Sequence, residues 1–163
     1  MHQGGDRGTK PFILGPEESM GPAGGPWRTR VVGLNTGGLL VIGDADMPPM
    51  SAGPSLHVHT YEDEASYVAD GVLTVVLGDE RFEVPAGGIA WLPRGVPHTF
   101  ANLGAEPVRV VGMVVPSGLE GMFAEQTEYF RSLEGPPDPD AIAEIGRRYG
   151  VTVVGPPIAI PEG

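Results

Sequence analysis

Three of the four histidines of this chain lie in one ordered pattern with a glutamate, and these residue types are common ligands of transition metals. The pattern is His57-x-His59-x4-Glu64, followed later by His98. Residues two apart on a strand point to the same face, so His57 and His59 are expected to project side by side. A short turn can return the Glu64 carboxylate to these imidazoles, and a turn containing proline and glycine precedes His98 and can direct its side chain. The sequence therefore predicts one metal site built from these four residues.

The donor set of three imidazoles and one carboxylate accepts one divalent transition metal ion, which can be Fe, Ni, Mn, Co, Cu or Zn. Four protein ligands leave one or two coordination positions for water, substrate or dioxygen, so the site can support catalysis. The simpler alternative is that His57 and His59 lie on the solvent-exposed face of a strand and bind no metal.

The same residues resemble the two sequence motifs of the cupins. The first motif is similar to His57-x-His59-x4-Glu64-x6-Gly71. The second is similar to Gly87-x5-Pro93-x-Gly95-x2-His98-x3-Asn102. One departure is the upstream glycine, because Gly53 lies closer to His57 than the motif has it. The resemblance implies an all-β fold, the cupin double-stranded β-helix or jelly-roll barrel, with the four residues as metal ligands.

Short apolar runs separated by turn residues agree with such a barrel. The chain has 26 glycines and 18 prolines, which suits many short strands joined by tight turns. Strands are expected at residues 28–32, 38–42, 56–59, 65–69, 73–77, 81–84, 89–92, 98–101 and 108–115, and a short edge strand at 10–14.

Two helices are expected after the barrel. The sequence from Ser117 to Glu120 has the pattern of a capping box that opens a helix running to about Leu133. Asp138 and Pro139 begin a second helix that ends at Gly150. We therefore divide the chain into an N-terminal arm or linker at 1–26, a cupin barrel at 27–116 and a C-terminal helical extension at 117–163 that packs on the barrel.

Composition limits the partners of this chain. The net charge of −11 argues against binding to nucleic acid or to an anionic membrane. We find no signal-peptide pattern and no apolar run of the about 20 residues that span a bilayer, so a cytoplasmic protein is expected. Without cysteine there are no disulfides and no thiolate ligands. The resemblance to small cupins implies a homodimer, for which the arm is a candidate exchange element.

Strand alternation also predicts which side chains line a substrate pocket. If Glu64 points inward, Ser66 and Val68 do too, while Phe100 and Asn102 share the face of His98. Two further apolar side chains are candidates for a pocket wall, namely Trp91 and Met113. For these apolar residues, ordinary core packing is the alternative.

The C-terminal extension that begins near Pro116 resembles that of bacterial quercetin-dioxygenase-like cupins. This resemblance implies a metal-dependent dioxygenase, an oxidoreductase of secondary metabolism that acts on a phenolic, flavonol-like or polyketide-like enol. Glu64 would then be catalytic and accept the proton of the substrate hydroxyl. The alternatives are a metal-assisted polyketide cyclase or isomerase, and a cupin that binds a small molecule without converting it.

Overall fold

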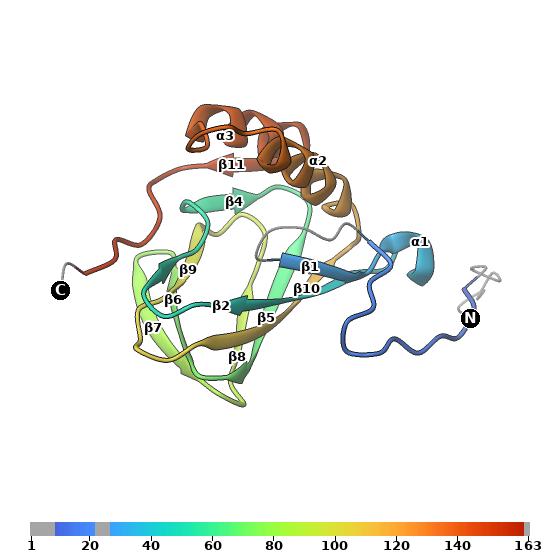
Figure 1. Ribbon diagram of the computed structural model, residues 1–163, viewed down its shortest axis with the longest axis horizontal. Helices are drawn as coiled ribbons and strands as arrows, with labels where there is room; N and C mark the ends of the chain where they lie inside the picture. The colour runs from blue at the N-terminus through green and yellow to red at the C-terminus, as the bar shows by residue number, and fades with distance from the viewer. Residues whose placement is uncertain (1–8, 22–26, 162–163) are drawn as a thin grey trace.

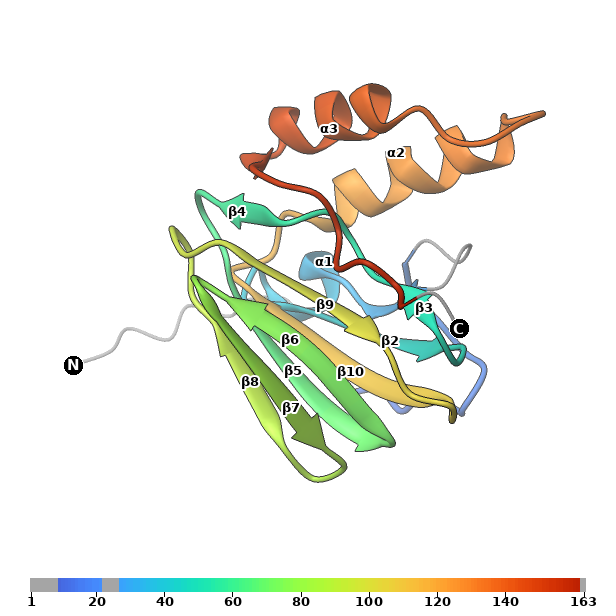
Figure 2. The ribbon, with the colours of Figure 1, turned by 90° about the vertical axis from the view of Figure 1, so that its left-hand side faces the viewer.

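The structure, a computed structural model, describes residues 9–21 and 27–161 (Figure 1). Within these residues the chain forms two antiparallel sheets that face each other, with two helices at one end of the barrel (Figures 1 and 2). The predicted all-β jelly-roll fold with C-terminal helices is confirmed.

The first sheet has five strands in the described part of the chain. Their order is β1 (Trp27–Val31), β2 (Val41–Met47), β10 (Val108–Val115), β5 (Asp63–Asp70) and β8 (Ile89–Leu92). The second sheet has the order β11 (Val151–Val153), β4 (His57–His59), β9 (His98–Asn102), β6 (Val72–Leu77) and β7 (Glu80–Pro85), and the short β3 (Ser51–Ala52) pairs with β9.

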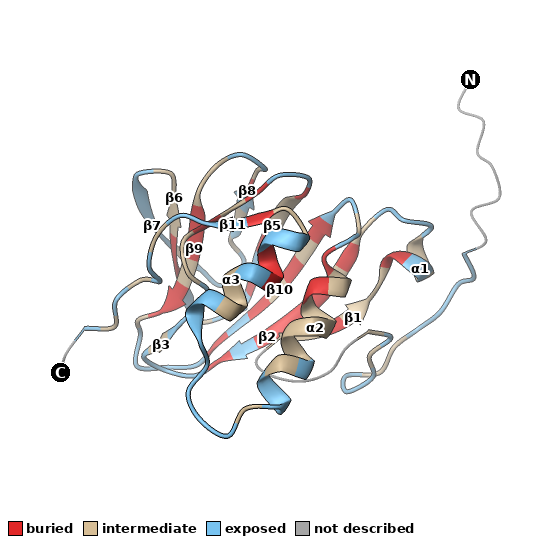
Figure 3. Ribbon diagram, turned by 90° about the horizontal axis from the view of Figure 1, so that it is seen from above, coloured by how far each residue is buried: buried red, intermediate tan, exposed pale blue. Residues whose placement is uncertain are grey.

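The core between the sheets follows from side-chain alternation. The inward residues of the central strands form one buried cluster that includes Val68, Leu73, Val75 and Val110. A second cluster joins Val41 and other barrel residues to the helices and β11. In Figure 3 the strands beneath the helices are largely buried, so the helices close this end of the barrel.

The two helices are α2 (Glu120–Arg131) and α3 (Pro139–Arg148). Asp138 caps α3 as expected, because its side chain accepts a hydrogen bond from the Asp140 amide. The capping box predicted from Ser117 to Glu120 is wrong. The Glu120 carboxylate instead accepts hydrogen bonds from the amides of Gly118 and Gly33, and so ties the start of α2 to the first residue of the short helix α1 (Gly33–Thr36).

Three local predictions differ from the structure. Residues 10–14 form no strand. The segment predicted as a strand at 38–42 begins pairing only at Val41, after a short helix α1 (Gly33–Thr36) that the sequence did not indicate. The C-terminal extension is not only helical, because β11 adds a strand to the edge of β4. Parts of the expected N-terminal arm, residues 1–8 and 22–26, lie outside the described residues.

A buried carboxylate organises the outer face of the first sheet. Asp44 accepts two hydrogen bonds from Arg28, at 3.0 and 2.9 Å, and one from Arg109 at 2.9 Å. Arg30 lies 3.4 Å from the same carboxylate and also donates to the carbonyl of Pro16 at 2.7 Å. The cluster therefore fixes residues of the N-terminal arm against β1 and β2.

No helix in the described residues is long and apolar enough to cross a membrane.

Candidate metal centre

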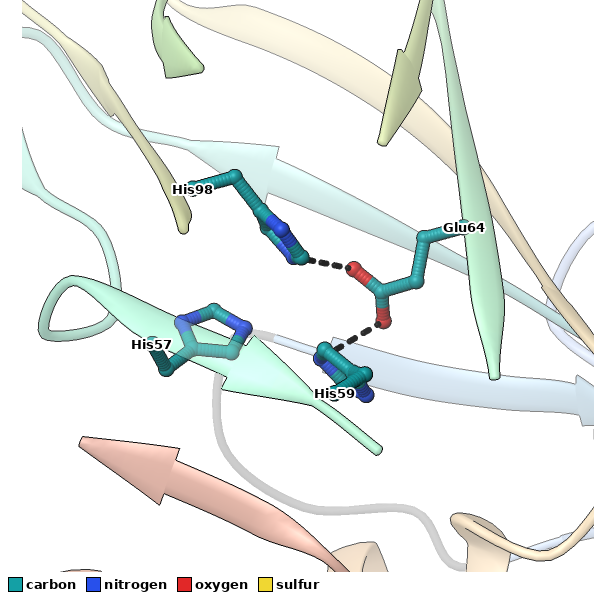
Figure 4. A group of neighbouring side chains, drawn as sticks. All are labelled: His57, His59, Glu64 and His98. Atoms are coloured by element: carbon teal, nitrogen blue, oxygen red, sulfur yellow. Dashed lines mark hydrogen bonds and ion pairs between the residues drawn. The ribbon is translucent and has the colours of Figure 1, made fainter. Parts of the chain in front are cut away.

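The four predicted ligand residues converge inside the barrel (Figure 4). His57 and His59 lie on β4, Glu64 on β5 and His98 on β9, so both sheets contribute. His57 pairs with His98 across the strands, which brings their ring centroids to 4.5 Å. One donor atom from each of the four residues lies within 4.8 Å of the others. This arrangement could hold one metal ion.

Hydrogen bonds set the orientation of two of the imidazoles. The Nδ1 of His57 lies 2.8 Å from the carbonyl of Ser55, and that of His98 lies 3.0 Å from the carbonyl of Val96. A carbonyl oxygen can only accept, so both Nδ1 atoms carry hydrogen and donate. In a neutral ring the Nε2 atom then has a free lone pair. Metal-bound histidines use this same arrangement.

The contacts of Glu64 provide a test of whether these residues fit a cation. Its Oε2 lies 3.3 Å from Nε2 of His98, and its Oε1 lies 3.7 Å from Nε2 of His59. A carboxylate oxygen and an unprotonated imidazole nitrogen are both acceptors, so their approach is unfavourable unless a proton or a cation lies between them. Neither nitrogen of His59 has a hydrogen-bond partner in the described residues, although both are buried. The donor set therefore fits a metal ion.

The electrostatics keep these groups in the forms that a metal requires. Burial, together with the proximity of His98, lowers the pKa of His57 from 6.5 to about 4, so this ring is neutral at pH 7. Burial also lowers the pKa of His59. Burial would raise the pKa of Glu64, but the imidazoles of His98, His59 and His57 around it lower this pKa overall, which favours the carboxylate.

The turn before His98 is fixed to the strand that carries Glu64. Asp63 accepts hydrogen bonds from the backbone amide, Nε and Nη2 of Arg94, at 2.9, 3.0 and 2.8 Å. These hydrogen bonds lower the pKa of Asp63 to about 2. Gly95 adopts a φ of 77° and donates its amide to the carbonyl of His59 at 2.9 Å. These contacts fix the turn before β9 to β5 and β4. They therefore fix the positions of the ligands on these three strands relative to one another.

The structure places three of the predicted pocket residues on the inner face of the barrel. Ser66 is buried and follows Glu64 by two residues on β5. Val68 is fully buried in the first core cluster, and the half-buried Phe100 packs against that cluster. Ser66 is therefore the residue of this group that lies beside Glu64 without belonging to the core cluster.

The other three predicted pocket residues lie elsewhere. Asn102 is fully buried, and its side chain donates to the carbonyls of Met47, Pro48 and Glu106 and accepts from the Gly104 amide. These contacts make it a structural link at the end of β9.

Trp91 and Met113 point away from the barrel interior. Both pair with Ala65, whose side chain alternates with the inward-pointing Glu64. Trp91 is 54% exposed and borders a surface groove of about 330 Å³ between β7 and β8. Their apolar character alone led to the expectation that they line the pocket, and the strand register corrects it.

The sequence did not single out Trp27, which packs on the barrel core, or Glu62, which contacts one of the ligand residues. The indole of Trp27 packs on the core and covers two glycines, because a Cβ at Gly43 or Gly112 would lie 2.1 or 2.6 Å from its ring. Glu62 is buried, and its Oε2 lies 3.6 Å from Nδ1 of His59. Burial raises the pKa of Glu62, and the nearby Glu64 adds to this. Only the fold reveals both positions, since neither residue belongs to a spacing pattern.

Comparison with known proteins agrees with the architecture. Residues 43–115 match the family model described as a cupin domain. The structure is similar to that of KdgF from Halomonas sp., with 18% identity and a TM-score of 0.55 over 68% of this chain and 96% of that chain. It is also similar to an uncharacterised conserved protein with a double-stranded β-helix domain from Klebsiella pneumoniae, with 26% identity and a TM-score of 0.52 over 67% of this chain and 93% of that chain. The barrel therefore has the double-stranded β-helix fold of these structures, and residues 43–115 resemble the cupin domain family.

A structural likeness at low sequence identity establishes only the fold. A predicted oxalate decarboxylase from Thermotoga maritima is 16% identical, with a TM-score of 0.52 over 55% of this chain and 78% of that chain. An uncharacterised protein of Methanocaldococcus jannaschii is 30% identical over 63 residues, which cover 39% of this chain and 50% of that relative. The chain thus spans about half the length of the curated relative that it matches.

Proposed function

We propose that this protein is a metal-dependent enzyme and that it oxygenates a small phenolic or enolic substrate with dioxygen. The observation that carries the metal centre is the convergence of three imidazoles on one carboxylate, with donor atoms within 4.8 Å and two rings already oriented by backbone carbonyls. His57, His59, Glu64 and His98 would hold the ion. When bound, a divalent transition metal supplies Lewis acidity and, if it is redox active, a meeting point for substrate and dioxygen.

Glu64 is the ligand best placed to react with a substrate. Its side chain is 17% exposed, whereas those of His59 and His98 are 2% and 0% exposed. Its lowered pKa favours the carboxylate, which can accept a proton. In the proposed reaction, Glu64 takes the proton of a substrate hydroxyl and thereby makes the adjoining carbon electron-rich for attack on dioxygen.

The surroundings of Glu64 support a planar, partly apolar substrate. Ser66 is a small residue beside it, and Phe100 contributes an aromatic face on the opposite sheet. Trp27 packs on the barrel core, and its buried Nε1–H has no hydrogen-bond partner in the described residues, so it can donate to a substrate that reaches it. A phenol or enol offers both an apolar plane and oxygen atoms that accept hydrogen bonds.

The test is turnover of flavonols and other enols by metal-reconstituted protein, measured as oxygen uptake and as product by mass spectrometry. The expected result is oxygen consumption by the wild-type protein that Glu64→Gln abolishes. Glu134→Gln, at an exposed position on the loop after α2, is the matched control and should retain activity. Equal turnover under argon would refute the oxygenase and favour a cyclase or isomerase, which needs only the Lewis acid and the carboxylate. Binding without conversion would favour a ligand-binding cupin.

A further inference from the structure

His59 differs from the other two histidines in what its outer nitrogen contacts. His57 and His98 each donate Nδ1–H to the carbonyl of the residue two positions earlier. The Nδ1 of His59 has no such carbonyl and lies 3.6 Å from Oε2 of Glu62. Both atoms are buried and have no hydrogen-bond partner within the described residues. Among the three histidines of the site, His59 is thus the one whose Nδ1 faces a carboxylate instead of a backbone carbonyl.

The burial of Glu62 also needs an explanation. The residue is 5% exposed, and it lies beneath the loop that leads into α2, where a Cβ added to Gly118 would lie 3.5 Å from its Oε1. A carboxylate removed from water is costly unless it has a partner. The partner that the fold offers to Oε2 is the Nδ1–H of His59.

We propose that Glu62 is a positioning residue of the metal centre, which accepts the Nδ1–H of His59 and so holds the Nε2 lone pair toward Glu64. This inference rests on the proposed metal centre. A carboxylate behind a metal-bound histidine fixes the tautomer and plane of the ring and increases its basicity. Glu62 therefore does for His59 what the carbonyls of Ser55 and Val96 do for the other two rings.

The neighbouring carboxylates cannot take this role. Asp63 is occupied by three hydrogen bonds from Arg94. Glu64 faces the opposite nitrogen of the ring, with its Oε1 3.7 Å from Nε2 of His59. Without Glu62, the Nε2–H tautomer of His59 is favoured, because Glu64 is then the carboxylate that can accept the proton. This tautomer cannot bind a metal through Nε2.

The experiment compares the wild-type protein with Glu62→Met, which keeps the length of the side chain but removes the acceptor, and Glu62→Gln, which keeps an acceptor oxygen without the charge. Glu134→Gln is the matched control, because it removes a carboxylate at an exposed position on the loop after α2. Long-range ¹H–¹⁵N correlation spectra of the metal-free proteins report the tautomer of each ring. The chain has four histidines, and the signal missing in His59→Gln assigns the ring in question. For each protein, the affinity for cobalt(II) and the melting temperature of the metal-free form are also measured.

We expect the Nδ1–H tautomer of His59 in the wild-type protein and in Glu134→Gln, with loss of its predominance in Glu62→Met and partial retention in Glu62→Gln. Cobalt(II) affinity should fall by about 10- to 100-fold in Glu62→Met. The melting temperature of that variant should not fall, because the substitution removes a buried carboxylate. A residue with a merely structural role would lower the melting temperature and leave the tautomer unchanged.

An Nε2–H tautomer of His59 in the wild-type protein, or unchanged tautomer and affinity in Glu62→Met, would overturn the inference. If the wild-type protein binds no metal, the proposed function fails, but the tautomer of His59 in the metal-free protein still decides whether Glu62 orients the ring.

Discussion

Protonation of His57 should destabilise the metal-free protein as the pH falls. Burial, followed by the proximity of His98, lowers the pKa of this imidazole from 6.5 to about 4. Between these two pH values the unfolded chain binds the proton and the folded protein does not, so stability decreases as pH is lowered through this window. A difference of about 2.5 units at about 1.36 kcal/mol per unit corresponds to about 3 kcal/mol. Because His57 is only 8% exposed, solvent screens little of this effect.

The assay is urea denaturation of chelator-treated protein at several pH values between 7 and 4, comparing the wild-type protein with His57→Gln. Carboxylates also contribute to acid destabilisation, but they are common to both proteins. The wild-type protein should therefore lose about 3 kcal/mol more of its free energy of unfolding than the variant over this range. A difference between the two proteins that stays constant with pH would refute the reasoning that burial keeps His57 neutral.

Three further outcomes follow from the structure. Metal at a hundredfold excess over its Kd should raise the free energy of unfolding by about 2.7 kcal/mol, and a chelator should reverse the accompanying rise in melting temperature; no shift in calorimetry would contradict the metal centre. Leu73→Ala, at a fully buried core position, should cost about 2–5 kcal/mol in urea denaturation, whereas Ile89→Ala, at a 64% exposed position, should cost less than about 0.5 kcal/mol; equal costs would contradict the core assignment. Asp44→Asn removes the charge that pairs with Arg28 and the adjacent arginines and should cost about 3 kcal/mol, so a neutral effect in the same assay would show that the cluster does not stabilise the sheet.

Much of the barrel could be predicted because its strands are short apolar runs bounded by turn residues. The ranges predicted at 89–92 and 108–115 coincide with β8 and β10. Elements that depend on distant partners were missed. The three residues of β11 become a strand only because they pair with β4, and the Glu120 side chain accepts a hydrogen bond from the first amide of α1, which is far away in sequence. Such partners are distant in the sequence, so local sequence patterns do not predict them.

The candidate site divides in the same way. His57, His59, Glu64 and His98 could be found because their spacing reflects strand alternation and a stiff turn. The other groups around them could not, because their positions depend on register and on packing between elements. The side chain of Trp91 points away from the barrel interior, because the residue pairs with Ala65. Glu62 lies beside His59 and beneath the loop before α2.

The central claim is that these four side chains hold one metal ion, and elemental analysis of freshly purified protein tests it most directly. We expect about one divalent transition metal ion per chain in the wild-type protein, and little metal in His98→Ala prepared in the same way, because this change removes one of four ligands. Equal metal content in the two proteins, or no metal in the wild-type protein even after reconstitution, would contradict the assignment of the site.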